Sequence, residues 1–184
     1  MPTQPEAGPI LACLREEHRS TDALVAAMDF ADVPRALAAF QQFGRRLERR
    51  IAWEESSLFP AMALSLFSIQ ESPSVSCRGC CASQRPGLGL RASGALDPTE
   101  MRCPACGIAT LARAGEDHIH IRNALDSVIQ ALRDGDAVAA ERQALSLREA
   151  LDSHHVIEER VLYPACDLFL SGEKARALLA GFDV

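Results

Sequence analysis

The sequence predicts an all-α fold: an antiparallel up-down four-helix bundle with a small cysteine-rich insert between the second and third helices. Four long stretches repeat apolar residues at alternating steps of three and four, and short turns divide them into two pairs. A motif of two Glu, two variable residues, Leu, an aromatic residue, Pro and Ala starts at Glu54 and again at Glu158, 104 positions later. A repeat of this kind indicates two similar halves.

The first half predicts two helices joined by a short turn. The first runs from about residue 10 to residue 30, and the second follows Asp32, a typical N-cap residue. Pro60 should kink or end the second helix, because proline lacks an amide hydrogen and crowds the preceding turn. The residues expected to face inward are Leu11, Leu14, His18, Thr21, Val25 and Met28, then Phe40, Phe43, Leu47, Arg50, Glu54, Ser57, Ala61 and Leu64.

The second half repeats this plan after an interruption rich in Ser, Gly, Pro and Cys. The third helix should end near Gly135, and Asp136 can cap the fourth. The residues expected to face inward are Leu111, Ala114, His118, Ile121, Leu125, Val128 and Leu132, then Leu147, Leu151, His154, Glu158, Val161, Ala165 and Leu168. The expected division is residues 10–67 and 108–170 for the bundle, 68–107 for the insert, and 171–184 for a short C-terminal helix.

Composition narrows the possible partners. The chain of 184 residues is 48% hydrophobic and carries a net charge of −6, which is typical of a globular protein and disfavours binding to nucleic acid. No apolar stretch is long enough to span a bilayer, and the N-terminus lacks the pattern of a secretory signal, so we expect no membrane partner. The seven cysteines include two C-x-x-C pairs, which favours metal binding in the reducing cytoplasm over disulfides.

Ionisable residues interrupt the apolar stripes at a similar distance from the two turns. Buried ionisable groups are costly unless they are paired or bound to metal, and bundle cores with inward Glu and His are typical of carboxylate-bridged metal centres. The alternative is a polar core in which these groups satisfy one another. The residues concerned are His18, Arg50, Glu54, His118, His154 and Glu158.

The residue types favour a transition metal. Imidazole and carboxylate suit divalent iron, manganese or zinc, and residues four apart, such as His154 and Glu158, face one point. Arg50 holds the position that corresponds to His154, and a guanidinium only donates hydrogen bonds, so it cannot be a ligand. The residues beside the stripes should make outer contacts or face solvent, unless His155 or Glu159 is a ligand instead. They are Glu55, His120, His155 and Glu159.

These motifs resemble the hemerythrin-like (HHE cation-binding) family. The resembling segments are Glu16-Glu17-His18, Glu116-Asp117-His118, the two Glu-Glu-x-x-Leu-aromatic-Pro motifs and the His-x-x-x-Glu element from His154 to Glu158. The resemblance implies a four-helix bundle with a non-haem di-iron site that binds oxygen or nitric oxide, senses redox state or stores metal. The ligands it implies are His18, Glu54, His118, His154 and Glu158.

The chain departs from this family at two positions. Arg50 stands where the family pattern has His, and Arg122 stands where a second inward His of the third helix would be. One metal ion, a labile second ion and a lost site all remain possible from the sequence.

The insert carries its own metal motif. Two C-x-x-C pairs separated by 22 residues can supply tetrahedral thiolate ligands, and they resemble a zinc ribbon or a rubredoxin-type iron site. A redox dithiol pair is the alternative. A closed four-thiolate site would be structural and would fold a segment poor in apolar residues. The predicted ligands are Cys77, Cys80, Cys103 and Cys106.

The sequence therefore predicts a metal-binding protein with iron in the bundle, mono- or dinuclear, and zinc in the insert. Small-ligand binding, redox sensing or iron handling is the first hypothesis. The second is a protein-interaction module whose bundle site has decayed and whose zinc ribbon is the docking surface. A di-metal enzyme is the third, and it is less favoured because no stripe residue offers a nucleophile or acid-base group beyond the ligands.

Overall fold

The computed structural model describes residues 8–70 and 104–182, and every regular element within these ranges is helical. The predicted all-α class is therefore confirmed for this part of the chain. In chain order the elements are α1 (Pro9–Ala26), α2 (Val33–Trp53), the π turn η1 (Glu54–Leu58), α3 (Phe59–Gln70), α4 (Pro104–Arg133), α5 (Ala137–Ile157), the π turn η3 (Glu158–Leu162), α6 (Tyr163–Phe169) and α7 (Gly172–Ala180).

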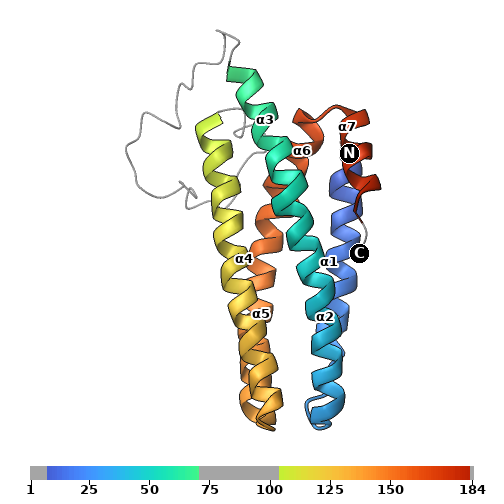
Figure 1. Cartoon of the computed structure of the whole chain (residues 1–184), viewed down its shortest axis with the longest axis vertical. Helices are drawn as coiled ribbons and strands as arrows, with labels where there is room; N and C mark the ends of the chain where they lie inside the picture. The colour runs from blue at the N-terminus through green and yellow to red at the C-terminus, as the bar shows by residue number, and fades with distance from the viewer. Residues whose placement is uncertain (1–7, 71–103, 183–184) are drawn as a thin grey trace, which may run out of the picture.

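The long helices lie along a common axis and form an elongated bundle (Figure 1). α2, η1 and α3 follow one another as one continuous rod, and α5, η3 and α6 follow one another in the same way. The α1–α2 and α4–α5 turns lie at the same end of the bundle, at the foot of Figure 1, while α7 lies near the opposite end beside α1. Within the described ranges, none of the helices combines the length and the apolar character needed to cross a membrane.

The two turns are built by the residues that the sequence marks as helix ends. The Asp32 side chain accepts a hydrogen bond from the Arg35 amide at 3.2 Å, and the Asp136 side chain accepts one from the Ala139 amide at 2.9 Å. Both predicted N-caps are thus confirmed. Gly135 has a φ of 76°, a left-handed conformation that glycine adopts without steric cost, and it ends α4 as predicted.

The start of α1 is capped by a residue from the far end of the chain. The Asp167 carboxylate in α6 accepts hydrogen bonds from the amides of Ile10 and Leu11 at 2.9 and 3.0 Å. A negative charge at a helix N-terminus satisfies unpaired amides and interacts favourably with the helix dipole. This contact ties α1 to α6 at the end of the bundle opposite the two turns.

The apolar core is divided into two clusters. One packs α1, α3, the first part of α4, α6 and α7 together at the upper end in Figure 1, and the other packs α2, the later part of α4 and α5 together toward the turns. Along each long helix, the buried ionisable residues lie between the members of these clusters. The polar centre of the molecule is therefore enclosed by apolar layers above and below.

The π turns correct part of the predicted inward stripe. A π turn adds one residue to a helical turn, so the positions that follow it rotate relative to a regular α-helix. Of the residues predicted to face inward, Ser57 is only half-buried, and Leu64 and Leu168 are 64% and 49% exposed. Ala61, Val161 and Ala165 are buried as predicted, and the neighbouring Leu58 and Met62 are fully buried as well.

The helices extend further toward the insert than the predicted boundaries at residues 67 and 108. α3 continues to Gln70 and α4 begins at Pro104, a residue favoured in the first turn of a helix. The remainder of the predicted insert, residues 71–103, lies outside the described residues.

Candidate metal centre

The two π turns place one glutamate each at the centre of the bundle. η1 begins at Glu54 and η3 begins at Glu158, and both side chains are fully buried. In each turn the amide of the aromatic residue that follows donates to the carbonyl of this first glutamate, five residues back. The wider turn precedes Pro60 and Pro164, so each proline enters at the start of a new α-helical segment, where it is tolerated. π turns of this kind often lie at functional sites.

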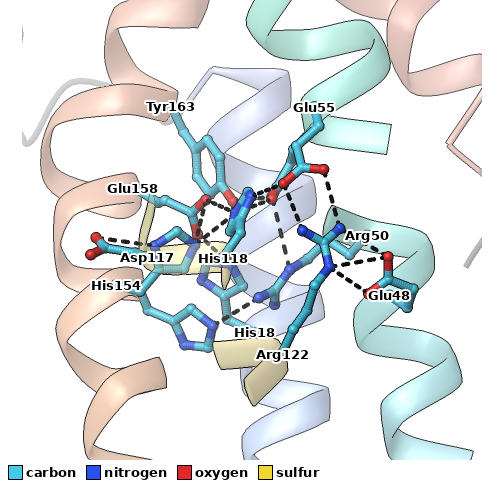
Figure 2. Close-up of polar contacts among 12 residues, drawn as sticks. His18, Glu48, Arg50, Glu55, Asp117, His118, Arg122, His154, Glu158 and Tyr163 are labelled. Carbon is cyan, nitrogen blue, oxygen red and sulfur yellow. Dashed lines mark hydrogen bonds and ion pairs between the residues drawn. The ribbon is translucent and has the colours of Figure 1, made fainter. Parts of the chain in front are cut away.

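Four buried side chains from separate elements bring their ligand atoms together at this level (Figure 2). The Nε2 atoms of His118 and His154 lie 3.1 Å apart. His118 Nε2 is 3.2 Å from Glu54 Oε2, and His154 Nε2 is 3.1 Å from Glu158 Oε1. All these ligand atoms lie within 4.8 Å of one another, so we call Glu54, His118, His154 and Glu158 the first group.

Carboxylates on the outer side set the orientation of these imidazoles. His118 Nδ1 lies 2.9 Å from Glu55 Oε1, and His154 Nδ1 faces Asp117 Oδ2 at 3.7 Å. A carboxylate at Nδ1 favours the hydrogen on that nitrogen and leaves the Nε2 lone pair directed at the centre. Arg122 in turn binds Glu55 through Nη1 and Nη2 at 2.9 and 3.1 Å, which fixes the supporting carboxylate.

The first group has the donor chemistry and the spacing of a metal site. With hydrogen on Nδ1, the two Nε2 lone pairs meet at 3.1 Å, which requires a proton or a metal ion between them. Two ligands about 2.0–2.1 Å from one ion are themselves about 3 Å apart, as these atoms are. Among the described residues, both Glu158 oxygens and Glu54 Oε2 are buried without accepting a hydrogen bond, so they retain capacity for a cation.

A second group shares Glu158 and faces α1. It consists of His18, His155 and Glu158, with His18 Nε2 3.3 Å from Glu158 Oε2 and the two imidazoles stacked at 3.7 Å. His18 Nδ1 lies 2.9 Å from Glu159 Oε1, an outer contact like the one that supports His118. Because Glu158 belongs to both groups, its carboxylate is in the position of a bridge.

Arg50 lies inside this second group. Its side chain is completely buried, its Nη2 donates to His155 Nε2 at 3.1 Å, and its Nε lies 3.8 Å from Glu54 Oε1. Burial opposes the charge of a guanidinium, but the surrounding acids, led by Glu54, raise the pKa of Arg50. The residue is therefore a permanent cation in contact with the candidate ligands.

An aromatic ring covers each half of the centre. Phe59 stacks on His118 with ring centroids 5.6 Å apart, and Tyr163 lies 5.7 Å from His18. The buried Tyr163 hydroxyl donates to Glu54 Oε1 at 2.6 Å. Burial, followed by the charge of Glu158, raises the pKa of Tyr163 well above its usual value, so the phenol remains a donor.

The charge balance of the first group calls for a cation at its centre. Burial opposes the negative charge of Glu158, but His154 and the neighbouring His18 outweigh it and hold the pKa of Glu158 well below its usual range. For His154 burial is likewise outweighed, and the acids around it, led by Glu158, raise its pKa to about 10. The raised pKa of His154 favours a proton on this imidazole in the metal-free protein, in the place where a metal ion would act.

The structure brings together every bundle residue singled out from the sequence as a metal ligand. Helical periodicity predicts neither an inward direction for His155, which corresponds to Ile51 in the first half, nor a role for Tyr163. His155 follows a predicted ligand directly, and the adjacent His-His pair was the available signal. Glu55 and Glu159 make the outer contacts that were expected of them. The residues brought together are His18, Glu54, His118, His154 and Glu158.

The four-cysteine site cannot be assembled from the described residues. Cys77, Cys80 and Cys103 lie outside them, and Cys106 lies in the first turn of α4. The zinc ribbon therefore stays a prediction. The remaining described cysteines, Cys13 and Cys166, lie in α1 and α6, and burial raises the pKa of both thiols.

A comparison with protein families supports the interpretation of the centre. The family model for the hemerythrin HHE cation binding domain matches residues 112–181. This segment contains His118, His154 and Glu158, three of the four residues in the first group. No curated protein and no solved structure shows significant similarity to the chain. The second half of the chain is thus similar to a domain whose described property is cation binding.

Proposed function

We propose that the chain is a hemerythrin-like protein whose antiparallel four-helix bundle binds non-haem iron. α2–η1–α3 and α5–η3–α6 each count as one rod in this bundle. The observation that carries the proposal is the first group, in which buried Nε2 and carboxylate atoms from four elements lie about 3 Å apart. Outer carboxylates orient the imidazoles as they do in metal sites.

The donor set selects among metals. Magnesium and calcium prefer sites made of oxygen ligands, whereas two imidazoles with two carboxylates suit iron, manganese or zinc. Iron is favoured by the family resemblance, and when bound it would supply a change of oxidation state and an open position for a small ligand. The protein would serve oxygen or nitric oxide binding, redox sensing or iron handling. The cytoplasmic location inferred from the cysteines stays a prediction.

The enclosure of the centre fits a small ligand. His18, Glu54, His118 and Glu158 have side chains with at most 1% exposure, and apolar clusters lie on either side of them. A shallow surface pocket lined by His155 and Glu159 lies over the second group, between α1 and α5. A bulky substrate would have to separate the helices to reach the first group.

A second candidate function is supported by Arg50. This residue is completely buried beside Glu54 and His155, so a cation lies at the position of the repeat where the second half has the candidate ligand His154. In this hypothesis the bundle site has decayed, and the zinc ribbon is a docking surface for a protein partner. The hypothesis predicts zinc bound by the insert and no metal bound by the bundle.

The test is metal analysis of protein purified without added metal, together with its electronic spectrum. Iron should be present, and His118→Asn should remove it. His120→Asn is the matched control, because His120 is an exposed residue on the same helix. Near-stoichiometric zinc with no iron in either protein would reject the iron proposal and favour the interaction module.

The four-cysteine prediction is tested separately. Replacing Cys103 with Ala should release zinc while the helical content measured by circular dichroism stays nearly constant. Loss of helical content throughout the chain would contradict the idea that the insert is a separate module.

A further inference from the structure

The second group contains a built-in cation. The guanidinium of Arg50 is completely buried, and its Nη2 donates to His155 Nε2 at 3.1 Å. The Nε2 lone pair of His155 is the atom that would bind a metal, so the hydrogen bond from Arg50 occupies it. Arg50 Nε also approaches Glu54 Oε1 at 3.8 Å, which brings the positive charge to the edge of the first group.

The internal repeat shows what Arg50 replaces. Arg50 precedes Glu54 by four residues at the end of α2, and His154 precedes Glu158 by four residues at the end of α5. His154 directs Nε2 at Glu158 Oε1, whereas Arg50 brings a charge and no lone pair to the equivalent place. The same comparison pairs His155 with Ile51, a buried apolar residue.

Arg50 and His155 are therefore two differences between the halves that match each other chemically. One contributes a buried donor and the other contributes the acceptor that it contacts. The Asp22 carboxylate faces His155 Nδ1 at 3.6 Å on the outer side, which favours an Nε2 that accepts. A buried charge needs such partners, because leaving it unpaired in the core is strongly unfavourable.

Formal charges favour one metal ion over two. The two buried carboxylates, Glu54 and Glu158, supply two negative charges at the centre. One divalent ion together with Arg50 leaves a net charge of +1, whereas two divalent ions together with Arg50 leave +3. A second ion would also lie near the guanidinium in a region of low dielectric constant, where like charges repel strongly.

We propose that the bundle binds a single divalent transition-metal ion in the first group, and that Arg50, paired with His155, permanently occupies the position of a second ion. This inference rests on the proposed function, because it assumes that the bundle binds metal. It replaces the di-iron site implied by the family resemblance with a one-metal site. The four ligands are Glu54, His118, His154 and Glu158.

The number of ions per chain tests the proposal. The protein is loaded with Co(II) without oxygen, freed of loosely bound metal and weighed by native mass spectrometry. Each bundle variant is also prepared with Cys77→Ser and Cys103→Ser, so that ions held by the insert can be subtracted. The wild type should retain one ion in the bundle, and two ions would overturn the proposal.

Substitutions at position 50 show whether Arg50 is the cause. Arg50→His should raise the count in the bundle from one ion to two, because it removes the charge and adds a ligand. Arg50→Lys should leave it at one, because the charge remains. Arg46→His is the matched control on the same helix: Arg46 is paired with Glu17 outside both groups, so the count should stay at one. A folded Arg50→His variant that still holds one ion would overturn the role of Arg50.

Failure of the proposed function gives a different result from failure of this inference. A wild type with no ion in the bundle, unaffected by His118→Asn, rejects metal binding altogether. If the bundle of the wild type holds two ions and His118→Asn loses them, the bundle does bind metal and only the one-metal site is rejected. If Arg50→His does not fold, as judged by circular dichroism, the count for the wild type still decides between one ion and two.

Discussion

In each half of the bundle a long helix reaches a pair of glutamates, opens into a π turn and continues through an aromatic residue and a proline. The first glutamate of each pair points at the centre, and the second supports a histidine of the other half. Glu55 contacts His118, and Glu159 contacts His18, so these outer contacts join the two halves. This shared arrangement is what the internal repeat conserves.

The halves differ at equivalent positions that surround these glutamates. The second half has His154, His155 and Tyr163, and the first half has Arg50, Ile51 and Phe59 at the corresponding places. Apolar packing and the π turns are retained in both halves. The difference teaches that the two halves share an architecture and differ in the donor groups that they bring to the centre.

The largest expected effect comes from the glutamate that both groups share. Glu158→Gln should abolish metal binding by the bundle, because it removes a charged ligand from the first group. It should also destabilise the metal-free protein by about 3–5 kcal/mol, since buried cationic partners lose their counter-ion. Titration calorimetry with Co(II) and urea unfolding measure the two effects.

Glu149→Gln, an exposed change on α5, is the control for Glu158→Gln and should behave like the wild type. Retention of wild-type metal affinity by Glu158→Gln would show that Glu158 is not a ligand.

The outer glutamates should have unequal effects. Glu55→Gln should weaken metal binding about 10–100-fold, because Glu55 supports His118, a residue of the first group. Glu159→Gln should change affinity much less, because it supports His18, which lies in the group that contains Arg50. Competition with a chelator of known affinity measures both. If Glu55→Gln and Glu159→Gln lose metal affinity to the same extent, the metal does not lie preferentially in the first group.

The tyrosine of the second half should stabilise the first half. Tyr163→Phe removes the hydrogen bond from the hydroxyl to the buried Glu54 carboxylate, at an expected loss of about 1.5–3 kcal/mol. Thermal unfolding should show a decrease of about 2–4 °C for each kcal/mol in a chain of this size. An unchanged melting temperature would indicate that Glu54 does not depend on this donor.

The last expected effect concerns the pH dependence of the stability of the metal-free protein. The pKa of His154 is raised to about 10 in the folded state and is close to 6.5 when unfolded, so protonation of His154 stabilises the fold. This contribution is complete below about pH 6.5 and is lost as the pH rises toward 10. Urea unfolding across this range should show the decline, and His154→Gln should flatten it. A stability that rises over the same range would contradict the assignment.

Helical periodicity was sufficient to predict much of the fold. The stripe of the third predicted helix, from Leu111 to Leu132, is buried throughout because α4 is a regular α-helix. After Glu54 and Glu158 the stripe holds only in part: Ala61, Val161 and Ala165 are buried as predicted, whereas the π turns change the register and leave Leu64 and Leu168 exposed. Pro60 and Pro164 indicate that the regular α-helix is interrupted there. They do not indicate how, because a kink, a helix end and a π turn are all compatible with a residue that lacks an amide hydrogen.

The candidate site was predictable as a set of residues and less so as a geometry. Ionisable residues on apolar stripes identified the inward ligands, since charge in a core requires a partner. The role of His155 could not be derived from periodicity, because successive helical residues point about 100° apart and only a core with two polar groups can receive both His154 and His155. Contacts between residues distant in sequence, such as that of Tyr163 with Glu54, depend on packing that the sequence pattern does not encode.

The π turns also bear on how insertions and deletions should be tolerated in this chain. Removing one residue from η1, for example Ser57, would let the Phe59 amide donate to the Glu54 carbonyl from four residues away instead of five, which is the bond of a regular α-helix. The segment from Phe59 onward would keep nearly the same orientation about the helix axis, so Phe59 could still stack on His118. The same deletion within a regular helix such as α4 would turn everything that follows by about 100°. A sequence alignment of related chains should therefore place single-residue gaps in the π turns rather than in the α-helical segments that carry the ligands.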